Sequence, residues 1–273
     1  MSIIIKGNQQ EVPGIVSVSW LDGNPKVKHI TDKDNRTRQI RGIVAHTHEG
    51  VRGILLPGNG PNTTLDERLA LYQTQTDRYV SWDYTLDLNG DVTWQNDPTK
   101  FYSWQATAVN PLTLGFEMIQ QLRKDEVGKV VGGDLYEGQI SAAVRMVDFL
   151  TATLGIQRQI PWDKVKNRPV QVVIPRIASG GENVVGIYGH RNVTTNRGPG
   201  DPGDALFYAL RDAGYELFDM ASGEDITVWK TRQQALGVSD LDGIPLSQTV
   251  QKLKESGKKH GLWVSRPIDD EIG

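Results

Sequence analysis

The stretch QIRGIVAHT, residues 39–47, predicts a buried β-strand that ends at a histidine. Its apolar positions Ile40, Ile43 and Val44 are β-branched, which favours a strand. The stretch NVVGIYGH, residues 183–190, has the same character and also ends at a histidine. Because the ends of adjacent strands lie close together, we expect the two imidazoles to meet at one edge of a sheet.

Two further stretches predict strands. The run YVSWDYTLDLNGDVTWQ, residues 79–95, consists of two alternating segments around Asn89 and Gly90. Asn-Gly is a strong signal for a two-residue hairpin turn, so this run predicts an antiparallel hairpin. TLGFEMIQ, residues 113–120, predicts another short buried strand, and it carries a glutamate inside an apolar context.

Helical patterns alternate with these strands. Apolar residues recur at helical spacing over residues 140–154, and Gly155 follows as a C-cap. Thr64 and Glu67 have the spacing of a capping box and predict an earlier helix, and residues 204–214 predict a closing helix. Interleaved strands and helices, together with the hairpin, predict an α/β domain with a mixed central β-sheet flanked by helices.

The pattern predicts two domains. The α/β domain occupies residues 1–220 and includes an irregular stretch, residues 156–183, with an extended run at residues 170–174. The segment ASGED, residues 221–225, is a plausible linker. Residues 225–273 predict a small helical C-terminal module, which is too short to bury a large core of its own.

Composition narrows the function classes. The chain has 273 residues and a formal charge of −3, so it has no electrostatic footprint for nucleic acid. It has no cysteine, so a zinc site must use histidine and carboxylate ligands. The N-terminus lacks the basic region of a signal peptide, and no apolar stretch approaches the length of a membrane span. We therefore expect a protein that is made in the cytoplasm and has no membrane span. If it acts outside the cytoplasm, another protein would release it, or a secretion or contractile device would inject it.

His46, Glu117, His190 and Asp201 are the candidate functional residues. Two histidines and an aspartate can hold zinc through three ligands and leave a fourth position for water. A separate carboxylate can then accept the proton of that water. The residue types and the strand before each of them predict metal-assisted hydrolysis.

Each residue also has a structural interpretation. A histidine at a strand end is commonly a hydrogen-bonded structural residue, and His48 is a rival ligand to His46 two positions earlier. Asp201, followed by Pro202, has the sequence of a helix N-cap. Glu117 would face solvent if its strand has one polar face.

Over residues 38–215 these pieces resemble the zinc-dependent N-acetylmuramoyl-L-alanine amidases of the type-2 group. That group also contains phage endolysins and peptidoglycan recognition proteins. GHRNVTTNRGPGDPG, residues 189–203, is similar to the family's G-H-R…D-P-G segment, and residues 113–120 are similar to its I-G-I-E strand. The resemblance implies that zinc is bound by His46, His190 and Asp201, and that Glu117 is the catalytic carboxylate.

Three positions depart from the family pattern. Asp83 and Gln105 each stand where the family usually has histidine, the latter in the segment Trp104-Gln105-Ala106. Pro199 stands where a basic residue often precedes the third ligand. Arg197 is the nearest basic residue and is therefore the candidate to stabilise the oxyanion. We expect these departures to alter the substrate preference and the rate of the reaction.

The resemblance implies a peptidoglycan or muropeptide substrate, cleaved between N-acetylmuramic acid and L-alanine. We expect the enzyme to be a monomer. Trp82, Tyr84 and Trp104 are candidates to line its groove, and the alternative is that they are core aromatics. Residues 229–253 loosely resemble small peptidoglycan-binding modules, with Leu246 where glycine is usual. The other candidate functions are a peptidoglycan-binding protein without activity and a metallopeptidase acting within the stem peptide.

Overall fold

The structure is a computed structural model. It describes residues 2–15, 18–20, 36–49, 80–94, 97–124, 130–181, 183–194 and 201–219.

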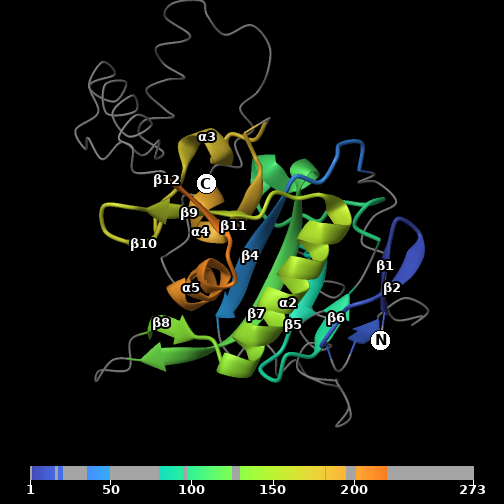
Figure 1. The fold of residues 1–273 in the computed structure, drawn as a ribbon, viewed down its shortest axis with the longest axis horizontal. Coiled ribbons are helices and arrows are strands. Elements are labelled where there is room, and N and C mark those ends of the chain that lie inside the picture. Colours follow the sequence, from blue (N-terminus) through green and yellow to red (C-terminus); the bar gives the residue numbers. More distant parts are fainter. Residues whose placement is uncertain are drawn as a thin grey trace, which may run out of the picture.

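A mixed β-sheet forms the centre of the molecule (Figure 1). Its strands are β3 (Val18–Trp20), β4 (Gly42–Glu49), β5 (Tyr84–Leu86), β6 (Val92–Trp94), β7 (Thr113–Lys124), β8 (Val130–Asp134) and β11 (Gly186–Gly189). The order across the sheet is β11-β4-β7-β5-β6-β3, and β8 pairs with the far part of β7. Strands β11, β4, β7 and β5 run parallel, whereas β6 runs antiparallel to β5. The predicted mixed sheet is therefore confirmed.

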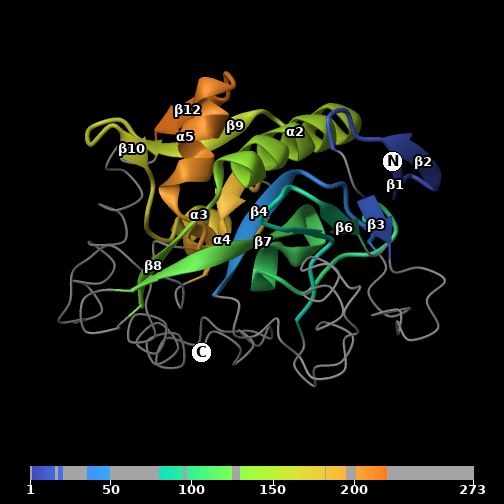
Figure 2. The same cartoon turned by 90° about the horizontal axis from the view of Figure 1, so that it is seen from below.

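Helices cover both faces of this sheet, as the view in Figure 2 shows. One face packs against α2 (Glu137–Leu154) and α5 (Asp204–Asp212), which bury Met146, Leu150 and Phe207 among the strands. The other face packs against η2 (Thr107–Leu112), α3 (Pro175–Ala178) and α4 (His190–Val193). The alternation of side chains along each strand decides which residues face which layer. In β4, Ile43 and Ala45 face α2, and Val44 faces η2 and α3.

Two smaller sheets flank the central one. Strands β1 (Ser2–Ile5) and β2 (Asn8–Glu11) form an antiparallel hairpin, and β10 (Arg168–Pro169), β9 (Gln159–Asp163) and β12 (Glu216–Asp219) form a three-stranded sheet. Both add apolar side chains to the core on the α2 side. Within the described residues, no helix is both long and apolar enough to cross a bilayer.

The hairpin of β5 and β6 and the helix α2 agree with the sequence, including Gly155 in the left-handed region at φ 69°. Two details differ. The β5–β6 connection spans residues 87–91 instead of two residues, because the Asp87 carboxylate accepts the N–H groups of Asn89 and Asp91. Residues 170–174 form no strand. The helix predicted from Thr64 lies outside the described residues.

Candidate metal centre

Strand register places His46 beside Glu117. Strand β4 pairs in parallel with β7, and His46 is the Cα partner of Glu117. Laterally paired residues of parallel strands point to the same face, so both side chains leave the sheet on the side opposite α2. His46 is 4% exposed and Glu117 is 7% exposed. Strand β4 continues to Glu49 past the predicted end at His46, and of the rival ligand His48 the structure describes only the backbone.

His190 follows strand β11, which lies parallel to β4, so its side chain arrives at the same edge as His46. It begins the short helix α4 and is not the last residue of the strand, and it is 6% exposed. A glycine precedes it for a steric reason. A Cβ on Gly189 would lie 2.9 Å from Cδ of Pro202 and 3.2 Å from the carbonyl oxygen of Asp201. Gly189 therefore lets the Asp201-Pro202 segment pack against the strand end.

Arg191 holds that segment in place. Its backbone N–H donates to the carbonyl of Asp201 at 3.1 Å, and its guanidinium pairs with Asp204 at 2.8 Å. The side chain is buried over the ring of Phe207. Burial lowers the pKa of Arg191, and the neighbouring Asp204 carboxylate partly offsets that effect. The G-H-R…D-P-G pattern thus describes one packed unit that carries two candidate ligands.

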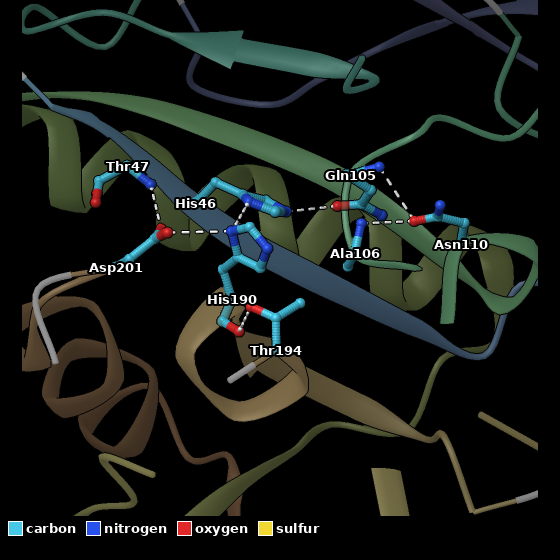
Figure 3. A network of polar contacts seen from close by, with 8 residues as sticks. All are labelled: His46, Thr47, Gln105, Ala106, Asn110, His190, Thr194 and Asp201. Carbon is cyan, nitrogen blue, oxygen red and sulfur yellow. Dashed lines mark hydrogen bonds and ion pairs between the residues drawn. The ribbon is translucent and has the colours of Figure 1, made fainter. Parts of the chain in front are cut away.

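The three candidate ligands converge in a buried cluster (Figure 3). Nδ1 of His46 lies 2.9 Å from Nδ1 of His190, and the ring centroids are 4.2 Å apart. Nδ1 of His190 lies 3.1 Å from Oδ2 of Asp201. One ligand atom from each residue lies within 4.8 Å of the others. The structure therefore brings together the three residues that the sequence predicted as ligands.

The cluster orients Asp201 and lowers the pKa of its carboxyl group. Its Oδ1 accepts the backbone N–H of Thr47 at 2.8 Å, and Oδ2 faces His190. Burial by itself raises the pKa of Asp201, but the hydrogen bond with His190, the charges of His46 and His190 and the Thr47 N–H together lower it below its usual value. The helix α5 has Gly203 as its N-cap, so the alternative in which Asp201 caps the helix is wrong.

The donor set fits zinc. Zn–N bonds of about 2.0–2.1 Å at a tetrahedral angle separate two ligand nitrogens by about 3.3 Å. The Nδ1 atoms of His46 and His190 are 2.9 Å apart, so an opening of a few tenths of an ångström would accommodate the ion. Two imidazoles and one carboxylate are also the ligand count of a catalytic zinc site, which keeps a fourth position for water.

Gln105 lies on the other side of the His46 ring. Its Oε1 is 2.7 Å from Nε2 of His46, and its Nε2 is 3.1 Å from Oγ1 of Thr113. Asn110 fixes the backbone here, since its Oδ1 accepts the N–H groups of both Gln105 and Ala106. From the sequence, Gln105 was recognised only as a departure from the family pattern, and no role was predicted for it.

Asp83, the other departure, is buried away from bulk water between strands. Its Oδ2 accepts the hydroxyl of Ser103 at 2.8 Å and the N–H of Gly115 at 2.7 Å. Burial raises the pKa of Asp83, while Arg36 and these two donors oppose the rise. Asp83 therefore joins the hairpin to β7.

The predicted groove residues are placed differently from one another. Tyr84 is 1% exposed and packs in the core on the α2 side of the sheet, so the expectation that it lines a groove beside His46 is wrong. Trp82 is buried against Ile119, and its indole N–H donates to Thr85. Trp104 is half-buried and stays a prediction. Arg197 lies outside the described residues.

No protein-family model and no curated protein sequence matches the chain. Among solved structures, the chain is similar to the N-acetylmuramoyl-L-alanine amidase LysC from Clostridium intestinale URNW, at 10% identity over 72% of this chain and 97% of that chain, with a TM-score of 0.38. It is also similar to the Staphylococcus aureus hydrolase AmiA in complex with its ligand, at 13% identity over 74% of this chain and 84% of that chain, with a TM-score of 0.38. A third similar structure is AmpDH3 from Pseudomonas aeruginosa in complex with anhydromuramic pentapeptide, at 17% identity over 92% of this chain and 84% of that chain, with a TM-score of 0.39.

Proposed function

We propose that the chain is a zinc-dependent N-acetylmuramoyl-L-alanine amidase, which hydrolyses the amide between the lactyl group of N-acetylmuramic acid and L-alanine. The observation that supports this most is the convergence of His46, His190 and Asp201 in one buried cluster, with Glu117 as the register partner of His46. The choice of bond rests on the resemblance of the segments around these four residues to the amidase family.

The two histidines and Asp201 would hold the ion. Zinc bound there supplies a water of near-neutral pKa and a Lewis acid for the scissile carbonyl. The environment of the three ligands suits this role, because burial excludes competing water and the Thr47 N–H orients the carboxylate. Packing around Gly189 and Arg191 holds Asp201 and His190 at a fixed separation.

Glu117 is the proposed general base. It would accept a proton from the attacking water and pass that proton to the leaving amine of L-alanine, which breaks the amide bond. Its position one strand from His46 on the same face places the carboxylate on the cluster's side of the sheet. Arg197 remains the proposed oxyanion stabiliser, on sequence alone.

We also propose that the enzyme acts as a monomer on wall material, at the cell wall or in the periplasm, after release or injection. Residues 225–273, outside the described residues, would then help to hold it on peptidoglycan. Trp82 is buried at 8% exposure, so Trp104 is the better candidate to touch sugar or peptide.

Mass spectrometry of digested muropeptides tests the proposal. Zinc-loaded protein should release intact stem peptides and leave glycan that carries unmodified lactyl groups. Shortened stems attached to glycan would identify a metallopeptidase instead, and the absence of products would identify a binding protein. Protein treated with a chelator is the matched control, and its activity should return when zinc is restored.

A further inference from the structure

A chain of hydrogen bonds leads from the backbone of η2 to the first candidate ligand. The hydroxyl of Thr113 donates to the carbonyl oxygen of Val109 at 3.0 Å. Gln105 contacts Thr113 through one end of its side-chain amide and His46 through the other. In this series of hydrogen bonds, each group is a donor or an acceptor according to the role of the group before it.

The roles follow from simple counting. A carbonyl oxygen only accepts, so the one hydroxyl proton of Thr113 points at Val109. The lone pairs of the Thr113 hydroxyl must then accept from Gln105, which requires the NH₂ end of the amide to face Thr113. The carbonyl end of Gln105 consequently faces His46, and it accepts a proton from Nε2 over 2.7 Å. The orientation of an amide is often ambiguous, but here the neighbouring hydroxyl decides it.

We infer that Gln105 is a positioning residue that sets the tautomer of His46. A neutral imidazole carries one proton, so a proton on Nε2 leaves the lone pair on Nδ1. Nδ1 is the atom of His46 that lies 2.9 Å from His190 in the ligand cluster. Gln105 thereby makes His46 ready to bind a metal through the nitrogen that faces the other ligands. This inference rests on the metal site of the proposed function.

The residues packed around Gln105 hold its side-chain amide in a defined position. A Cβ on Gly115 would lie 2.8 Å from Oε1 and 2.9 Å from Cδ of Gln105, so β7 leaves space for this side chain. Asn110 holds the backbone of Gln105 through two accepted N–H groups (Figure 3). Acceptors that fix the ring N–H of a metal-binding histidine also raise its basicity as a ligand.

The first test uses metal-free wild-type protein and needs neither zinc nor substrate. Long-range nitrogen–proton NMR, at a pH where the ring is neutral, distinguishes a proton on Nε2 from one on Nδ1. The His46 signals are assigned by their loss in His46→Ala. A proton on Nε2 is expected, and a proton on Nδ1 would overturn the inference. Because this readout does not involve catalysis, it separates a failure of the inference from a failure of the proposed amidase activity.

The second test measures zinc affinity by competition with a chromophoric chelator. Gln105→Met removes the acceptor at similar side-chain length and should weaken zinc binding by about 10–100-fold. Gln159→Met is the matched control, since Gln159 is also part-buried and donates to the carbonyl of Val185 instead. Wild-type affinity in Gln105→Met would contradict the inference.

Two further variants separate the hydrogen bond from packing. Gln105→Glu keeps an oxygen toward His46 and should restore most of the zinc affinity and the Nε2 proton. A Glu variant as weak as the Met variant would show that disturbed packing causes the loss, and would overturn the inference. Thr113→Val, which is nearly isosteric, leaves the amide orientation undetermined and should reduce the fraction of His46 with its proton on Nε2. An unchanged fraction would remove Thr113 from the chain of bonds.

Discussion

Replacing Glu117 by glutamine is the sharpest test of the proposed general base. The amide has almost the same shape but cannot accept the proton of the attacking water. General acid–base catalysis contributes typically 10²–10⁴-fold to a rate, so kcat should fall by about that factor. At about 1.4 kcal/mol for each factor of ten, the loss corresponds to roughly 3–6 kcal/mol of transition-state stabilisation.

The structure predicts that this loss comes without a loss of fold or metal. Glu117 is buried at 7% exposure and is the register partner of His46, but it is not among the three clustered ligand atoms. Glu117→Gln should therefore keep its zinc and nearly the same melting temperature. Turnover is measured on a soluble muropeptide with saturating zinc, and Glu137→Gln, at an exposed glutamate of α2, is the control. Near-normal kcat with full zinc occupancy would remove Glu117 from the mechanism.

Three other predictions concern the metal, the fold at high pH and the C-terminal region. His190→Ala removes a candidate ligand atom, Nδ1, that lies 2.9 Å from Nδ1 of His46 and 3.1 Å from Oδ2 of Asp201. Elemental analysis of this variant should find little zinc, and activity should be lost while the circular dichroism spectrum stays that of the wild type. Full zinc occupancy would count against the site. Burial raises the pKa of Tyr188 from 10.0 to about 12, against the opposing hydrogen bond from Val185, so the unfolded chain releases this proton before the folded one does. The wild type should therefore lose up to about 3 kcal/mol of stability as the pH rises through that window, and urea unfolding of Tyr188→Phe should show a shallower loss. Ending the chain at Gly223 should weaken sedimentation with intact peptidoglycan and leave turnover of a soluble muropeptide; aggregation of the truncated protein would instead indicate that residues 225–273 pack on the α/β domain.

The clustering of His46, His190 and Asp201 was predictable because it rests on local signals. Each histidine follows a run of β-branched residues, and parallel strands bring their carboxyl ends to one edge. The role of Gly189 and Arg191 was not predictable, since it depends on how residues 201–204 fold back onto β11. Gln105 was missed for a similar reason. Its partner His46 is 59 positions away, and only the tertiary structure shows that its amide meets an imidazole.

Turn chemistry explains two differences in the strands. The hairpin of β1 and β2 was not predicted, because its turn is Lys6-Gly7 and lacks the usual asparagine, although both residues have positive φ, 56° and 74°. Asn89-Gly90 gave the expected signal, but the carboxylate of Asp87 accepts two backbone N–H groups and widens the connection. A side chain that competes for backbone donors overrides the dipeptide preference.

The small sheet of β10, β9 and β12 was missed for a different reason. Strand β9 contains Pro161, which weakens a strand prediction from sequence. It nevertheless pairs on both sides, antiparallel with β10 and parallel with β12. The neighbouring run at residues 170–174 has the composition of a strand but forms none, although Val170 donates its N–H to the carbonyl of Pro161 at 3.3 Å. The pairing of β9 with segments distant in sequence is what the sequence pattern did not show.

A crystal structure of the zinc-loaded protein, with anomalous scattering at the zinc edge, tests the central claim most directly. The account predicts one zinc ion per chain between Nδ1 of His46, Nδ1 of His190 and the carboxylate of Asp201, with Nε2 of His46 still bonded to Gln105. A zinc ion held elsewhere, or a cluster of these three residues that binds none at saturating zinc, would contradict it.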